Sequence, residues 1–460
     1  MSGGSGIGDS SGVSGISAGP APADQPGRAA KPVGPADTFG WDIGGAHVKA
    51  CRLHHGRVQD VVQWPCPLWL GLPHLAQVLT AAQARWPGLG QARHAVTMTG
   101  EMADLFADRQ TGVQRIAAVV ASQLGAGPAL RFYAGDAGWC HASNVAAQWR
   151  AIASANWLAS ARHAALVLGK SPAAGPARAD AERHGEGVLI DIGSTTTDLI
   201  AFRGGRVLTT ARTDHQRLAS GELVYQGVVR TPLCALARRL PWRGAPINVI
   251  NELFATSADV YRLTGELAPA HDQQPSADGA AKTLAASRQR LARLVGLDAH
   301  DASDADWLAL AQAWRAEQVA ELRGQLARVV DQHGLGRQAL LVTAGCGDFL
   351  APLLVAGDVA GDVAAAVHGA ADTAGQPGAS PRCRPYAQAV ARLAPDALAG
   401  SAAWAQVCAP SVAVAALLLH DSAAAAKHAR PRARPRPRPR PARPGPAAVP
   451  PARAPLPELR

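Results

Sequence analysis

Two stretches of the chain alternate short apolar runs with polar turns in the same order. In the later stretch, the apolar residues Val188 to Ile190 end at Asp191, a turn rich in glycine and hydroxyl groups follows, and a second apolar run begins at Leu199. Apolar runs of this length, bounded by turn residues, predict short β-strands joined by a tight turn.

The earlier stretch repeats this pattern 149 positions upstream. Without gaps, Asp42-Ile43-Gly44 falls on Asp191-Ile192-Gly193, and Gly56-Arg57-Val58 falls on Gly205-Arg206-Val207. Each copy is therefore predicted to form strand, Asp-Ile-Gly turn, strand, Gly-Arg turn and strand. A repeated supersecondary unit indicates two related lobes, each presenting one turn to a cleft between them.

The remaining pattern alternates strands and helices, as in an α/β protein. We assign residues 38–170 to a first lobe and residues 187–420 to a second lobe. In the second lobe, residues 282–332 have helical spacing and are predicted to form a helical insertion that covers a core. A strand from Leu340 runs into a glycine turn at 345–347, and residues 409–418 are predicted to form the last core helix.

Three segments are too poor in large apolar residues to form a core. Residues 1–37 and 421–460 are predicted to be disordered tails, the second rich in arginine and proline, and residues 171–186 are predicted to connect the lobes.

The net charge of +10 changes this picture little, because it is concentrated in the second tail. Ten Lys/Arg and one Glu lie between Lys427 and Arg460, a net charge of +9, so the rest of the chain is near neutral. The tail can bind polyanions loosely, but it lacks aromatic residues for base stacking. We therefore expect no specific nucleic-acid partner.

Cysteine usage and the chain ends predict a soluble cytoplasmic protein. The seven cysteines are odd in number and none forms a Cys-x-x-Cys pair, which argues against a zinc site or a disulfide framework. The start lacks the pattern of a secretory signal. The longest apolar run, around Val412 to Leu419, is shorter than the ~20 residues of a membrane helix, so no membrane partner is expected. The oligomeric state stays open, a homo-oligomer included.

The two Asp-Ile-Gly turns carry groups suited to phosphate. Their glycines permit close backbone approach, hydroxyls donate hydrogen bonds, and carboxylates hold phosphate through a hard cation, so Asp42 and Asp191 are predicted Mg²⁺ ligands. Asp198 is either a turn cap or part of the site, and strand alternation would turn Lys49 outward if it does not contact the phosphate. The predicted phosphate-binding residues in the turns are Gly44, Gly45, Lys49, Gly193, Ser194, Thr195 and Thr196.

Two further residues are candidates for proton transfer. His47 lies in the first turn, where it could donate to a phosphate or move a proton; a structural histidine is the alternative. Glu101 follows a predicted strand and is a candidate general base or amine-binding carboxylate. Its alternative role is to stabilise the amides at a helix start.

Four segments in combination resemble the hydantoinase/oxoprolinase-like proteins of the sugar kinase, heat-shock-70 and actin superfamily. They are Trp41 to His47, Thr97 to Glu101, Ile152 to Trp157 and Asp191 to Asp198. Within this family, the sequences of these segments are similar to those of the branch linked to tetrahydromethanopterin-dependent one-carbon transfer. This branch includes the archaeal synthase of the methylofuran core, a furan-methanamine. The resemblance covers about residues 38–419.

The resemblance implies a two-lobed actin/heat-shock-70/sugar-kinase-like fold and a transferase of alkyl or aryl groups other than methyl. An aminomethylfuran-methyl diphosphate would be condensed with the phenol of γ-glutamyltyramine, releasing diphosphate, with Mg²⁺ as cofactor. In the superfamily, the glycine turn of Gly345 and Gly347 abuts the nucleotide or its replacement, which adds both to the predicted phosphate site. The implied catalytic residues are Asp42, Asp191, Glu101 and His47.

Three other functions remain open. An ATP-dependent small-molecule kinase would need an adenosine pocket near residues 345–347. An amide hydrolase like the larger oxoprolinases usually requires more chain or a partner subunit. A non-enzymatic nucleotide-binding protein is the third alternative.

Overall fold

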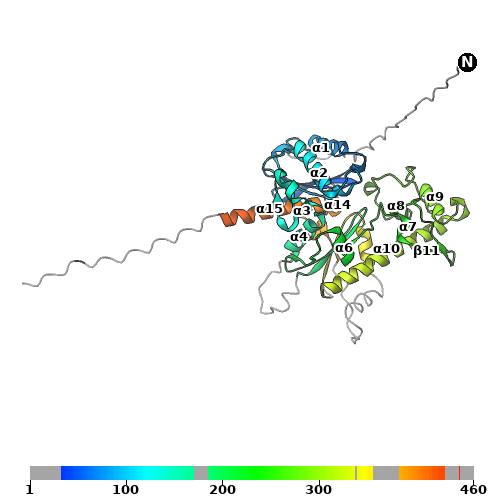
Figure 1. Cartoon of the computed structure of the whole chain (residues 1–460). Helices are drawn as coiled ribbons and strands as arrows, with labels where there is room; N and C mark the ends of the chain where they lie inside the picture. The colour runs from blue at the N-terminus through cyan, green and yellow to red at the C-terminus, as the bar shows by residue number, and fades with distance from the viewer. Residues whose placement is uncertain (1–32, 170–184, 337–338, 356–382, 430–444, 446–460) are drawn as a thin grey trace, which may run out of the picture. The chain divides into compact units, whose positions relative to one another are not determined.

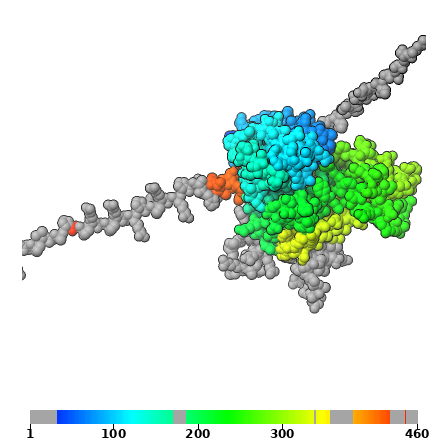
Figure 2. Space-filling view, in the orientation of Figure 1, coloured from blue at the N-terminus to red at the C-terminus, as the bar shows by residue number. Residues whose placement is uncertain are grey.

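Two β-sheets, one in each α/β lobe, organise the chain (Figure 1). The computed structural model describes residues 33–169, 185–336, 339–355, 383–429 and 445. The predicted tail at 1–32, most of the predicted connection at 171–186 and nearly all of the Arg/Pro-rich stretch after 429 lie outside the described residues. Figure 2 shows the surface of the first lobe, blue to cyan, meeting the green surface of the second.

The sheet of lobe 1 has the strand order β3-β2-β1-β4-β5-β6. Strands β1, β2 and β3 pair antiparallel, whereas β4 and β5 continue the sheet parallel to β1. The strands are β1 (Asp37–Ile43), β2 (His47–His54), β3 (Arg57–Pro65), β4 (Arg93–Met98), β5 (Leu130–Tyr133) and β6 (Trp139–Cys140). The helices are α1 (Pro73–Arg85), α2 (Arg109–Leu124) and α3 (Val145–Ile152), with 3-10 turns η1 (Leu68–Leu70), η2 (Leu89–Gln91), η3 (Gly100–Met102), η4 (Gly135–Ala137) and η5 (Ala142–Asn144).

The sheet of lobe 2 has the order β10-β8-β7-β13-β14, with β9 paired to β8. Its strands are β7 (Gly187–Ile192), β8 (Thr197–Arg203), β9 (Arg206–Val207), β10 (Leu223–Val224), β13 (Leu340–Ala344) and β14 (Cys383–Pro385). A separate hairpin comprises β11 (Arg239–Trp242) and β12 (Ala245–Asn248). The helices after β7 are α6 (Asp214–Ser220), α7 (Leu233–Leu236), α8 (Ser257–Leu263), α9 (Leu284–Leu294), α10 (Asp304–Gln332), α11 (Ala351–Val355), α13 (Tyr386–Ala389), α14 (Ser401–Val407) and α15 (Ala409–Ala429), with 3-10 turns η6 (Pro269–His271), η7 (Ala299–Asp301) and η8 (Asp348–Leu350).

The strand-turn-strand duplication predicted from sequence is confirmed by the strand register. In lobe 1, Asp42 lies opposite Lys49 on β2. In lobe 2, the matching Asp191 lies opposite Asp198 on β8. In each lobe a third strand, β4 or β13, runs parallel to the strand that carries the first aspartate. The two-lobed α/β fold with duplicated turns is therefore present, and the two copies differ in charge at the second position.

The predicted helical insertion at 282–332 consists of two helices, α9 and α10, separated by the turn η7. Trp307, Trp314 and Leu322 of α10 are fully buried. Gln318, also buried, accepts a hydrogen bond from the Tyr261 hydroxyl and donates one to the Gly227 carbonyl. The insertion thus covers a core, as its apolar spacing predicts.

Two helices pack on the sheet of the other lobe. Helix α4 (Asn156–Leu168) follows the lobe 1 sheet in the chain, but Trp157 and Leu158 belong to the same buried cluster as the lobe 2 strands. Helix α15 follows the lobe 2 sheet, yet its Ser411 lies directly against Gly40 on β1. The lobe boundaries predicted from the sequence therefore do not tell which sheet α4 and α15 pack against.

Helix α15 ends at Ala429, beyond both the expected core helix at 409–418 and the expected tail boundary at 421. Alanine has the highest helix propensity, and four alanines at 423–426 continue the helix. Among the described residues, the window Ala409–Ala426 is long and apolar enough to cross a membrane, with a mean hydropathy of 1.4. Half of that window is buried inside the protein.

The close approach of α15 to β1 gives a first prediction. A Cβ atom at Gly40 would collide with the Ser411 carbonyl oxygen and lie 2.9 Å from the Ala415 Cβ. We expect Gly40→Ala to lower the free energy of unfolding by about 3 kcal/mol, because neither backbone can move without repacking. Urea unfolding measures this, with Gly90→Ala as control, since a Cβ there meets nothing within 4 Å. Equal stability of the two variants would contradict the prediction.

Candidate functional site

A pocket of about 350 Å³ brings the two Asp-Ile-Gly turns together. From lobe 1 it is lined by Asp42, Gly44, Gly45, His47 and Lys49, and from lobe 2 by Gly193, Ser194, Thr195, Thr196 and Asp198. Most of the residues predicted from the turns therefore face a single cavity. Asp191, Glu101, Gly345 and Gly347 are not among its lining residues.

Each turn is closed by the same backbone hydrogen bond. The Gly44 amide donates to the His47 carbonyl at 2.9 Å, and the Gly193 amide donates to the Thr196 carbonyl at 2.8 Å. In lobe 2, the amides of Val229 and Arg230 also donate to the Ser194 carbonyl. The turns are thus fixed by backbone contacts, which leaves the hydroxyls of residues 194–196 directed to one another or to the pocket.

A cluster of buried and partly buried carboxylates shares the positive charge of Lys49. The Lys49 ammonium lies 3.6 Å from Asp42 Oδ2. Burial lowers the pKa of Lys49, but the acidic groups around it, Asp42 first among them, more than offset this and hold it above its ordinary value. Lys49 therefore points inward and stays charged, against the alternative that strand alternation turns it outward.

The positive charge of Lys49 offsets only part of the effect of burial on Asp42 and Asp191. Burial raises the pKa of Asp191 to about 7, with Lys49 opposing the shift and Asp198 and Asp42 adding to it. Burial likewise raises the pKa of Asp42, against the effect of Lys49. Asp42 Oδ1 is buried and has no hydrogen-bond partner among the described residues. A cation placed here would meet carboxylate oxygens that the protein leaves unsatisfied.

Asp198 is neutralised by an ion-pair chain that crosses between the lobes. Arg217 of α6 lies 2.5 Å from Asp198 and 3.1 Å from Asp214, and its guanidinium stacks 4.4 Å from the Trp157 ring. Asp214 in turn pairs with Arg109 of α2 in lobe 1. Asp198 is thus held by Arg217, in keeping with a supporting position rather than a free ligand.

The predicted phosphate glycines at 345 and 347 pack against the Asp191 turn and are not among the pocket-lining residues. A Cβ at Gly345 would collide with the Ile192 carbonyl and lie 2.6 Å from Asp191 Oδ1, and a Cβ at Gly347 would lie 2.5 Å from Ile192 Cγ2. The Gly345 φ of 88° also favours glycine. Both residues therefore support the Asp191 turn from behind, outside the pocket.

His47 is a buried, neutral histidine. The Gln274 amide donates to His47 Nε2 at 3.0 Å, so the ring proton resides on Nδ1. Burial, reinforced by Lys49 and Arg230, lowers the pKa of His47 to about 3. His47 therefore brings no positive charge to a phosphate at neutral pH, although Nδ1–H remains a donor.

Glu101 lies just behind the pocket wall. Only 1% of the residue is exposed, and burial raises its pKa to about 7, although a hydrogen bond from Ser154 opposes the shift. The Ser154 hydroxyl donates to Glu101 Oε1 at 2.6 Å and itself lines the pocket. A carboxyl whose pKa lies near neutrality is suited to accept a proton.

Several lining residues have no signal in the sequence pattern. The Arg230 guanidinium of lobe 2 stacks 5.2 Å from the ring of Trp69 in lobe 1, and pairs with no carboxylate of the described residues. Tyr225 lies at the same pocket and is 55% exposed. Arg230 and Trp69 lie outside any motif, so only the folded arrangement identifies them as a cation and an aromatic surface at the site.

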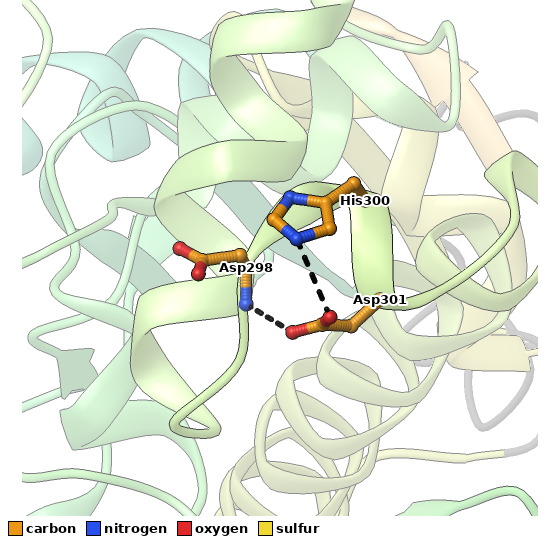
Figure 3. Close-up of side chains that lie close together, drawn as sticks. All are labelled: Asp298, His300 and Asp301. Carbon is orange, nitrogen blue, oxygen red and sulfur yellow. Dashed lines mark hydrogen bonds and ion pairs between the residues drawn. The ribbon is translucent and has the colours of Figure 1, made fainter.

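A separate acidic cluster lies on the surface of lobe 2 (Figure 3). The ligand atoms of Asp298, His300 and Asp301 lie within 4.8 Å of one another, and all three residues are exposed. Asp301 accepts a hydrogen bond from the Asp298 amide and thereby caps the turn η7. We assign this cluster to turn capping.

Comparison with known proteins identifies relatives in sequence. The hydantoinase/oxoprolinase family model matches residues 93–359, more than half of the chain. A protein of Methanocaldococcus jannaschii is 27% identical over 56% of this chain and 72% of its own length. A protein of Methanococcus vannielii is 26% identical over 35% of this chain and 71% of its own length. Both are named as synthases of a furan-2-yl methanamine carrying a (γ-glutamylamino)ethyl-phenoxymethyl group.

Two solved structures show a more distant similarity. A ROK family glucokinase from Streptomyces griseus in complex with glucose and AMPPNP covers 83% of this chain at 14% identity, with a TM-score of 0.39 and 98% of its own chain covered. A nucleotide-free acetone carboxylase covers 68% of this chain at 10% identity, with a TM-score of 0.41 and 66% of its own chain covered. The sequence relatives, named as synthases, support an enzyme.

The raised pKa of Glu101 predicts a pH-dependent change in stability. Folding raises the pKa of Glu101 from 4.5 to about 7. The contribution of Glu101 to the free energy of unfolding is therefore complete below pH 4.5 and is lost as the pH rises through about 7. We therefore expect the difference in free energy of unfolding between Glu101→Gln and wild type to shift in favour of the variant between pH 5 and pH 8. The expected shift is on the order of 3 kcal/mol. Thermal midpoints at both pH values test this, with the exposed Glu252→Gln as control. A difference between variant and wild type that does not change with pH would refute it.

Proposed function

Because this chain belongs to the hydantoinase/oxoprolinase family, we propose that it is a transferase that joins an aminomethylfuran-methyl diphosphate to the phenol of γ-glutamyltyramine and releases diphosphate. The observation that carries the proposal is the single pocket lined by both Asp-Ile-Gly turns together with Lys49 and Arg230. The two sequence relatives named as synthases of a phenoxymethyl-furan methanamine support the same substrate class.

The pocket offers donors for a diphosphate from lobe 2. The Ser194, Thr195 and Thr196 hydroxyls line it on one side, and Arg230 adds a guanidinium that no carboxylate of the described residues neutralises. A guanidinium can bind phosphate oxygens through two parallel hydrogen bonds. Stacking on Trp69 limits its motion, so Arg230 is oriented before the leaving group acquires charge.

The carboxylate cluster fits Mg²⁺. Asp42 has a buried oxygen without a partner among the described residues, and the charge of Lys49 acts on both Asp42 and Asp191. Asp42 and Asp191 would hold the ion, which would neutralise charge on the departing diphosphate. Asp198 supports the site through its pair with Arg217.

The acceptor phenol needs a proton acceptor. Its unperturbed pKa of about 10 leaves little phenolate at neutral pH. Glu101, with a pKa of about 7, is the group next to the pocket whose basicity suits this task. His47 is a weaker candidate, because burial lowers its pKa to about 3.

The proposed reaction predicts a product that mass spectrometry can detect. Full-length protein with Mg²⁺, the furan-methyl diphosphate and γ-glutamyltyramine should form the aryl ether and diphosphate in equal amounts, without ATP. Mass spectrometry detects the ether and a coupled assay the diphosphate, and EDTA should abolish both. A parallel reaction with ATP in place of the diphosphate serves as control. ATP turnover driven by the amine, with no ether, would instead assign a kinase or an ATP-dependent amide hydrolase.

The paired-turn site predicts how its aspartates behave together. Asp42→Asn and Asp191→Asn keep the side-chain size but remove the charge that would hold Mg²⁺, so each should lower turnover by about 10²-fold or more. The double variant should be much less than multiplicatively worse, because parts of one catalytic unit fail together. Steady-state rates across a Mg²⁺ titration measure this, with the exposed Asp331→Asn as control. Near-wild-type turnover in a folded single variant would remove that aspartate from the site.

A further inference from the structure

Ser154 has an unfavourable backbone conformation at the edge of the pocket. Among the described residues, three non-glycine residues have a positive φ: His55, Ser154 and Arg243. The other two each precede a glycine in a hairpin turn, where this conformation is usual. Ser154, at φ 50°, lies instead between α3 and α4. A strained residue that persists in a folded protein is held there by its surroundings, and such residues cluster at functional sites.

Helix capping does not explain this conformation. Helix α4 begins at Asn156, its N-cap residue is Ala155, and no side chain caps it. The Ser154 hydroxyl instead donates to Glu101 Oε1 at 2.6 Å. Its position therefore serves the contact with Glu101.

Ser154 separates Glu101 from the pocket. The serine lines the pocket, whereas Glu101 does not. Glu101 Oε2 is buried without a hydrogen-bond partner among the described residues. The backbone of Glu101 packs closely on α2, where a Cβ at Gly112 would lie 2.5 Å from the Glu101 carbonyl oxygen. A group in the pocket can thus exchange a proton with Glu101 through the Ser154 hydroxyl.

We propose that Ser154 and Glu101 form a proton relay that receives the proton of the acceptor hydroxyl, which deepens and rests on the proposed function. As the phenol O–H bond breaks, its proton passes to Ser154 Oγ, and the serine proton passes to Glu101 Oε1. The phenolate oxygen forms the bond to the furan methylene carbon, and the electron pair of the broken carbon–oxygen bond leaves with diphosphate. The proton ends on Glu101, and Ser154 is restored as a hydroxyl.

Two charged side chains from neighbouring helices act on Glu101. Arg109 of α2 lowers the pKa of Glu101, and Asp214 of α6 raises it. Asp104, three residues after Glu101 in the chain, lines the same pocket. Arg109 and Asp214 pair with each other, and their effects on the pKa of Glu101 oppose one another. The hydrogen bond from Ser154 therefore tunes a carboxyl whose pKa is raised mainly by burial.

The first test compares rates and pH profiles. Glu101→Gln and Ser154→Ala should each lower kcat by about 10²-fold, and the double variant should be no worse than either, because the pair acts as one unit. Loss of the hydroxyl removes a donor to the charged carboxylate, so the acid limb of the residual rate should move to higher pH in Ser154→Ala and vanish in Glu101→Gln. Ser154→Gly, which suits a positive φ, removes the hydroxyl without strain and should match Ser154→Ala. The exposed Ser143→Ala is the control and should match wild type.

A second measurement does not depend on turnover. In protein with ¹³C-carboxyl-labelled glutamate, the NMR signal absent from Glu101→Gln reports the titration of Glu101, which should move to higher pH in both Ser154 variants. If wild type forms the ether but both Ser154 variants keep its rate and this titration, the relay is wrong and the proposed reaction stands. If wild type forms no ether, the proposed reaction is wrong. In that case, a Glu101 titration that is the same in the Ser154 variants as in wild type overturns the coupling of Ser154 and Glu101, whereas a titration at higher pH supports it.

Discussion

The burial of several carboxylates beside one lysine is the electrostatic constraint on which the site depends. Asp42 and Asp191 occupy matching ends of paired strands, and burial raises the pKa of both. Lys49 lies 3.6 Å from Asp42 and offsets only part of this charge. A second cation is therefore favoured at the point where the two lobes meet, because carboxylates desolvated together attract positive charge more strongly than exposed ones.

The duplication is symmetric in backbone and asymmetric in charge. Lys49 in one lobe corresponds to Asp198 in the other, and each faces the aspartate of its own turn across the hairpin. A second lysine in place of Asp198 would balance the negative charges of Asp42 and Asp191. With an aspartate there, Arg217 is recruited from α6 to hold the extra charge. Because the two turns differ in charge at this position, together they form one acidic cluster with Lys49 and Arg217 as neighbouring cations.

Contacts between the lobes fix the shape of this site. The Gln274 amide bonds to both Ala46 and His47, and Arg109 pairs with Asp214 at the pocket edge. The exchange of α4 and α15 between sheets adds buried apolar surface to the same junction. A pocket formed by two lobes keeps its dimensions only when such contacts are made, and the polar ones here lie next to the groups proposed to bind substrate.

The sequence by itself determined the two lobes and the aspartates at 42 and 191, because a strand-turn-strand unit is encoded by residues adjacent in the chain and a repeat exposes it twice. Tertiary structure alone decided that Arg230 stacks on Trp69, that Ser154 bonds to Glu101, and that the glycines at 345 and 347 support a turn. Each of these contacts joins segments far apart in sequence, so its distance and burial are set by packing and leave no local pattern to read.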